Sequence, residues 1–142
     1  MNVFFDTSSL FKLYHQEQGT QEILDFFEIN KINRIYVSEI AKIEFASVIW
    51  RKCKMGEVKE DDAKILLSKF EIDLQKFTVI PFNQQLSNNS IILIGKYWKS
   101  GLRTLDSIQL ASVIEIKKEI EYFFTSDLIL KEISILEGLK TV

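Results

Sequence analysis

The sequence predicts an α/β fold in which a parallel sheet is covered by helices on both faces. Short apolar runs, rich in β-branched and aromatic residues, alternate along the chain with longer segments of helical period. The predicted strands are almost continuously apolar, which is typical of strands that are buried on both sides. The length of 142 residues, of which 46% are apolar, is enough for one domain with its own core. We therefore expect a single domain over residues 1–142.

The elements follow from these patterns in chain order. Buried strands are expected at 2–5, 34–37, 77–80 and 121–124, and the run 139–142 is a candidate edge strand. Helices are expected at 9–28 (with a break at Gly19 left open), 39–54, 60–75, 84–99, 105–119 and 128–136. In a parallel sheet of this kind, ligands bind beyond the carboxyl ends of the strands. Polar residues that follow a strand directly are therefore the first candidates for a functional site.

Composition excludes several classes of protein. A single cysteine, Cys53, can form neither an internal disulfide nor, with the only histidine, His15, a cysteine-based zinc site, so a reducing, cytoplasmic location is expected. No apolar run approaches the roughly 18 residues that a membrane span requires. The net charge of −2 argues against a protein that holds duplex nucleic acid by charge alone.

Two acids occupy positions that suggest chemistry. Asp6 follows the first strand directly, although an aspartate there can also cap the next helix. Glu44 has Ala41, Ile40 and Val48 as its neighbours three and four residues away, so its carboxylate is expected on or beside the buried face of a helix. A buried carboxylate needs a partner, a proton or a metal ion. A salt bridge to another element remains the structural alternative.

Two further acids lie near helix starts. Asp106 is expected in the first turn of a helix, and Asp127 directly follows the fourth strand. Each can simply complement the helix macrodipole. Taken together with Asp6 and Glu44, they can converge at the carboxyl edge of the sheet, where four carboxylates would repel one another. A hard divalent cation with oxygen ligands, Mg²⁺ or Mn²⁺, would relieve that repulsion.

The segments that carry these acids resemble the PIN-domain family, and within it the VapC-type toxins of bacterial and archaeal toxin–antitoxin pairs. The resemblance extends from Val3 to about Ile133 and rests on four segments: DTSSL after the first strand, the helix of Glu44, LRTLDSIQLA around Asp106, and TSD at Asp127. It implies a three-layer α/β/α sandwich with a central parallel sheet.

The resemblance also implies a function and a site. The four acids, Asp6, Glu44, Asp106 and Asp127, correspond to the family's catalytic, metal-binding carboxylates, and Ser8 and Thr125 match hydroxyl positions that support them. The expected activity is that of a Mg²⁺-dependent (or Mn²⁺-dependent) endoribonuclease that hydrolyses RNA phosphodiester bonds. The expected partners are RNA, a cognate antitoxin protein and a second copy of the chain.

Positive charge near the acids is sparse. Arg103, three residues before Asp106, and Lys12 are the candidate contacts to RNA phosphates, although either can be an ordinary solvated charge. Two alternatives to a toxin remain: a PIN scaffold that binds RNA or protein without cutting, and a house-keeping PIN nuclease in RNA processing. A phospho-receiver is disfavoured, because Phe82-Asn83 stand where that fold needs an aspartate after its third strand.

Overall fold

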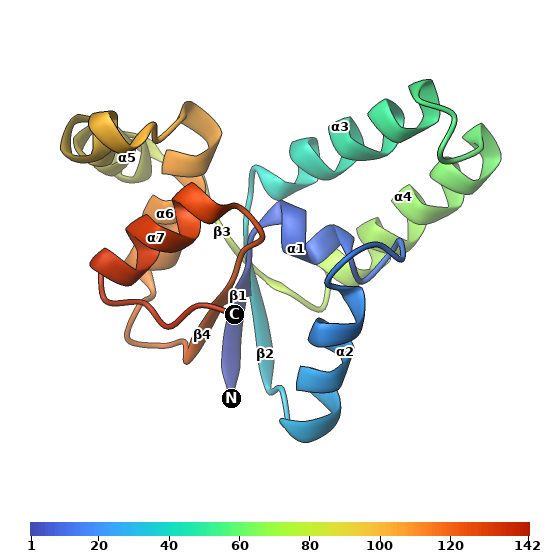
Figure 1. Ribbon diagram of the computed structural model, residues 1–142, viewed down its shortest axis with the longest axis horizontal. Helices are drawn as coiled ribbons and strands as arrows, with labels where there is room; N and C mark the ends of the chain where they lie inside the picture. Colours follow the sequence, from blue (N-terminus) through green and yellow to red (C-terminus); the bar gives the residue numbers. More distant parts are fainter.

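Four parallel strands form the centre of the molecule, as seen in the computed structural model of residues 1–142 (Figure 1). The strand order across the sheet is β3-β2-β1-β4, with every neighbouring pair parallel. The elements, in chain order, are β1 (Asn2–Phe5), α1 (Thr7–Phe11), α2 (Thr20–Ile29), β2 (Arg34–Ser38), α3 (Ala41–Lys54), α4 (Glu60–Leu74), β3 (Thr78–Ile80), α5 (Gln84–Tyr97), a 3₁₀ turn η1 (Trp98–Ser100), α6 (Thr104–Glu115), β4 (Tyr122–Phe124) and α7 (Leu128–Leu136).

Alternation along the strands divides the core between two helical layers. Phe4 and Phe123 point to the face covered by α5, α6 and α7, where their rings meet edge to face at 5.6 Å. Phe5 and Phe124 point to the opposite face, covered by α1 to α4, where their rings stack at 4.4 Å. The two layers form the two arms on either side of the sheet in Figure 1. The predicted three-layer α/β/α sandwich is confirmed.

The predicted strands and most of the helices are confirmed to within a few residues. The segment 9–28 is broken, which the sequence had left open at Gly19: α1 ends at Phe11 and α2 begins at Thr20. Gly19, with a φ of +90°, precedes α2, and Thr20 Oγ1 donates to the Lys12 carbonyl across the break. The break is therefore wider than Gly19 alone predicts.

Two other predictions concern the C-terminal third. The helix predicted over 105–119 ends at Glu115, and residues after it turn toward β4. The candidate edge strand 139–142 is reduced to one parallel bridge between Thr141 and Phe123. None of the helices is both long enough and apolar enough to span a bilayer.

Candidate active site

The carboxyl edge of the sheet collects the four predicted acids from four different helices. Because β1 and β4 are parallel neighbours, Asp6 and Thr125 leave the sheet at the same edge, and the Asp6 amide donates to the Phe124 carbonyl at 3.0 Å. Asp127 follows two residues later, at the start of α7. Glu44 and Asp106 each lie in the first turn of a helix, α3 and α6.

Asp6 is the most deeply buried of the four. Its side chain caps α1 by accepting from the Ser9 amide at 2.8 Å, and the Ser8 hydroxyl donates to the same oxygen at 2.8 Å. The other oxygen accepts from the Thr125 hydroxyl. Burial raises the pKa of Asp6 to about 6, although these hydrogen bonds act in the opposite direction. Asp6 is therefore both a helix cap and a buried carboxylate that lacks a cationic partner.

Glu44 is half-buried and forms no ion pair, so the salt-bridge alternative is wrong. Its Oε1 accepts from the Thr7 hydroxyl at 2.9 Å and from Gln109 Nε2 at 2.7 Å. The same Gln109 nitrogen also donates to the Thr7 hydroxyl at 3.1 Å, which closes a three-membered network. Burial raises the pKa of Glu44, and the negative charge of Asp106 adds to the shift.

Asp106 and Asp127 interact through their charges. Burial raises the pKa of Asp106, the charge of Asp127 raises it further, and Arg103 opposes both. Arg103 Nε lies 3.7 Å from Asp106 Oδ2, but the arginine side chain is 80% exposed, so this pair is weak. Asp127 caps α7 by accepting from the Leu130 amide at 2.8 Å, and its own amide donates to the Thr125 hydroxyl at 3.2 Å.

Ser8 and Thr125, predicted as supporting hydroxyls, both contact Asp6, and Thr125 additionally joins it to Asp127. The sequence analysis missed Thr7 and Gln109. A signal for Gln109 was available, because it lies three residues after Asp106 and so shares its side of α6. Gln109 is 2% exposed, and its Oε1 has no hydrogen-bond partner. Lys12 lines a neighbouring cavity whose lining includes Ser9 and Thr125 but none of the four acids.

The donor set fits a hard divalent cation. Every candidate ligand is a carboxylate oxygen. The charge of Asp106 raises the pKa of Glu44, the charge of Asp127 raises that of Asp106, and only Arg103 offsets them. No three of the acids lie close enough to hold one ion by themselves. Mg²⁺ does not require that, since it retains several waters and uses one or two carboxylates together with substrate phosphates. The shared metal site is therefore a prediction that this arrangement permits.

The comparisons with known proteins now identify the family. The PIN-domain family model matches residues 3–136. The chain belongs to the PIN-domain family. The PIN-domain segments that carry Asp6, Glu44, Asp106 and Asp127 all lie within the matched region. No curated protein matches the chain in sequence.

Solved structures share the PIN-domain fold over nearly the whole chain. Toxin VapC20 of Mycobacterium tuberculosis, described as cleaving the sarcin–ricin loop, is 16% identical with a TM-score of 0.69, covering 92% of this chain and 94% of its own. The VapBC2 complex of Rickettsia felis, solved with promoter DNA, is 16% identical with a TM-score of 0.65, covering 100% and 98%. FitAcB of Neisseria gonorrhoeae is 12% identical with a TM-score of 0.72, covering 98% and 95%. At these identities the likeness establishes the fold alone.

Proposed function

We propose that the protein is a Mg²⁺- or Mn²⁺-dependent endoribonuclease and the toxin of a toxin–antitoxin pair. The observation that carries the proposal is the set of four acids at one edge of the sheet, which lack strong cationic partners and have raised pKa values at Asp6, Glu44 and Asp106. PIN domains are generally nucleases, and membership of that family supports a nuclease role. The similar structures described as a toxin that cleaves the sarcin–ricin loop and as a toxin–antitoxin complex support the choice of RNA and of a toxin.

A bound divalent cation stabilises charge on a scissile phosphate and lowers the pKa of a coordinated water. One or two of the carboxylates of Asp6, Glu44, Asp106 and Asp127 would hold the ion, with waters and substrate phosphate oxygens as its other ligands. Ser8, Ser9 and Thr125 fix both oxygens of Asp6, whereas Thr7 and Gln109 fix only Oε1 of Glu44. Glu44 Oε2 accepts no hydrogen bond and is the oxygen free to take a proton from an attacking water.

The proposed second copy of the chain has a candidate binding surface on α5. The helix α5 and the turn after it expose Ile91, Ile92 and Trp98, each 66% accessible. Exposed apolar side chains in one region are typical of protein interfaces. We assign this surface to a second copy of the chain, and the edge of the sheet that carries the four acids to a cognate antitoxin. Light scattering of the purified protein, which measures its molar mass in solution, tests the dimer. A cytoplasmic location stays a prediction.

Purified protein incubated with total RNA tests the proposed activity. We expect cleavage in millimolar Mn²⁺, none in EDTA, and none with the Asp106→Asn variant in either buffer. Cleavage that persists in EDTA or in the variant would contradict the metal mechanism. RNA that binds but stays intact under every condition would instead identify a non-cleaving scaffold.

A further inference from the structure

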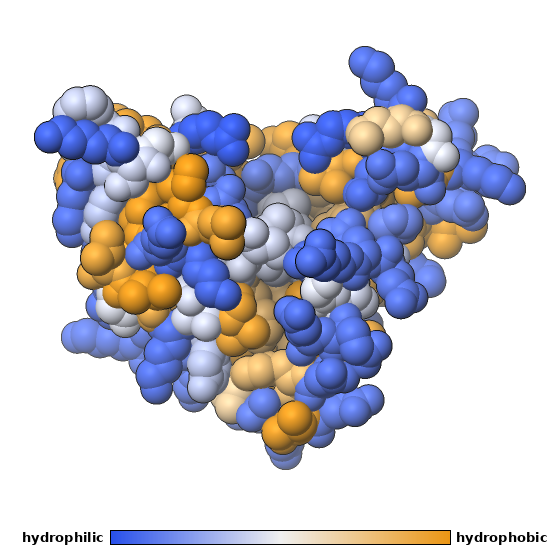
Figure 2. Space-filling view, viewed as in Figure 1, coloured by the Kyte–Doolittle hydropathy of each residue, from blue (hydrophilic) through white to orange (hydrophobic).

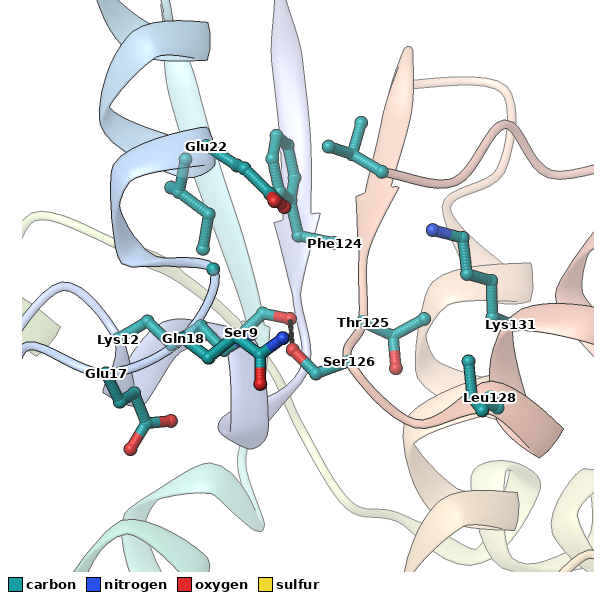
Figure 3. Close-up of a pocket in the computed structure, with 13 residues that line it drawn as sticks. Ser9, Lys12, Glu17, Gln18, Glu22, Phe124, Thr125, Ser126, Leu128 and Lys131 are labelled. Atoms are coloured by element: carbon teal, nitrogen blue, oxygen red, sulfur yellow. Dashed lines mark hydrogen bonds between the residues drawn. The ribbon is translucent and has the colours of Figure 1, made fainter.

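A second feature of the carboxyl edge is a cavity beside Asp6. It has a volume of about 690 Å³ and lies between the α1–α2 connection, the end of β4 and the start of α7 (Figure 3). The cavity opens in the hollow between the two helical arms, where residues of intermediate hydropathy form the floor (Figure 2). Ser9 and Thr125, which hold Asp6, also line it. The cavity therefore shares a wall with the candidate active site.

Two lysines line this cavity from opposite sides. Lys12 follows α1, and Lys131 extends from α7 toward β4 (Figure 3). Both are half-buried, and neither forms an ion pair or a side-chain hydrogen bond. Both ammonium groups are therefore available to an anion in the cavity.

The backbone makes room for one of these charges. Gly19 has a φ of +90°, and a Cβ at this position would lie 2.5 Å from the Lys12 ammonium. The positive φ favours glycine at this position, and any larger residue would displace the flexible end of the Lys12 side chain.

Neutral and acidic groups complete the lining. The hydroxyls of Ser9 and Ser126 lie 3.1 Å apart at the floor and can each turn toward a bound oxygen. Of the two acids, Glu17 is paired with Lys52 at 3.4 Å, and Glu22 is exposed, with its carboxylate beside Phe124 in Figure 3. The lining thus offers two ammonium groups and two hydroxyls, which are donors that phosphate oxygens accept from, with Glu22 as the one unpaired acid.

We propose that this cavity binds a backbone phosphate of the RNA strand next to the one being cut, with Lys12 and Lys131 as its cationic contacts. The inference rests on the proposed function, because it takes RNA as the substrate. A groove that follows the RNA backbone needs positive charge beside the acidic site, and the acids themselves repel phosphate. The two lysines supply that charge in a chain whose net charge is −2.

RNA binding by lysine variants tests the assignment. All proteins carry Asp106→Asn to suppress cleavage, and fluorescence anisotropy follows a labelled single-stranded RNA from 50 to 300 mM KCl. Each contact to single-stranded RNA contributes about 0.7 to the slope of log K against log salt, so Lys12→Gln with Lys131→Gln should reduce the slope by about 1.4 and the affinity by about 25-fold at 0.1 M salt. The matched control is Lys118→Gln, an exposed lysine before β4, at the opposite edge of the sheet.

A second arm uses inorganic phosphate and does not depend on RNA. Phosphate at constant ionic strength should raise the melting temperature of the lysine-intact protein and not that of the double variant. A double variant that matches Lys118→Gln in slope and affinity would overturn the proposal. Stabilisation by phosphate with unchanged RNA affinity would reassign the cavity to a free phosphate compound. If the double variant loses RNA affinity but the wild type cuts no RNA, the phosphate subsite is upheld and the proposed nuclease activity is refuted.

Discussion

Asp6 and Glu137 are both carboxylates held by hydroxyl hydrogen bonds, yet Asp6 is buried among neutral donors, whereas Glu137 is partly exposed and has a cationic partner. Glu137, at the end of α7, accepts from Tyr97 and lies 2.6 Å from the Lys96 ammonium. Burial acts to raise the pKa of Glu137, but its bonds to Lys96 and Tyr97 outweigh it and the pKa is lowered. Asp6 has only neutral donors, and its pKa rises to about 6.

The difference separates two uses of an acid in the folded chain. Glu137 joins α5 to α7, and its negative charge is neutralised by Lys96, so it needs no cation as a ligand. Asp6 and Glu44 are held in place by hydroxyl, amide and backbone groups, and Asp106 pairs only with the exposed Arg103, so the charge of all three is left largely uncompensated. Acids arranged in this way are typical of sites that bind a cation.

The largest effect is expected on cleavage. Replacing Asp106 by Asn removes one of the four carboxylates of the candidate site and should lower the rate of RNA cleavage by about 10³-fold or more. Replacing Glu137 by Gln is the matched change at the compensated acid and should leave the cleavage rate within about twofold. Single-turnover rates in Mn²⁺ measure both. Equal losses of cleavage rate in the two variants would contradict the distinction between the uncompensated acids and the ion-paired Glu137.

The next effect is on stability as pH changes. The pKa of Asp6 rises from 3.8 to about 6 on folding, so the folded protein holds this proton more tightly than the unfolded chain. Its contribution to stability is therefore present below about pH 4 and is lost as pH rises to about 6. The change is worth up to about 3 kcal/mol.

Urea unfolding in EDTA at pH 4.5 and pH 7 measures this contribution. The free energy of unfolding of Asp6→Asn should fall less between the two pH values than that of the wild type, since its amide does not titrate. The variant should also match or exceed the wild type at pH 7. A large loss of stability at pH 7 would show that capping α1, rather than binding a cation, is the main role of Asp6.

A smaller effect is expected from the group that positions Glu44. Replacing Gln109 by Leu removes the donor to Glu44 Oε1 and should lower cleavage by about 10- to 100-fold, as is typical for groups that orient metal ligands. Gln109→Glu, which retains the size and places a charge beside Glu44, should be at least as impaired. Affinity for Mn²⁺ should fall with the rate. An unchanged Mn²⁺ affinity would limit Gln109 to a packing role.

Much of the fold could be predicted because its signals are local. Phe4-Phe5 and Phe123-Phe124 identify strands buried on both faces, and a parallel sheet follows from the helices between them. The break after Phe11 could not be predicted, because it depends on the hydrogen bond from Thr20 to the Lys12 carbonyl, which forms only in the folded chain. Helical period alone does not detect such tertiary contacts.

Some residues of the candidate site could likewise be predicted from local sequence signals, and others could not. Asp6 and Asp127 were predictable as acids that follow strands, and their meeting at one edge follows from parallel pairing. The roles of Thr7 and Gln109 depend on how closely α1, α3 and α6 approach one another, which no sequence pattern specifies. The pairing of Lys12 with Lys131 across a cavity likewise joins residues 119 positions apart.

Binding of Mn²⁺ to the free protein tests the central claim most directly, because it needs neither RNA nor catalysis. Thermal melts in EDTA and in millimolar Mn²⁺ should show the wild type and Glu137→Gln stabilised alike, by about 2.7 kcal/mol at one hundred times Kd. Asp6→Asn and Asp106→Asn should gain clearly less than the wild type. Equal stabilisation of all four proteins by Mn²⁺, or of none, would contradict the assignment of the uncompensated acids as a metal site.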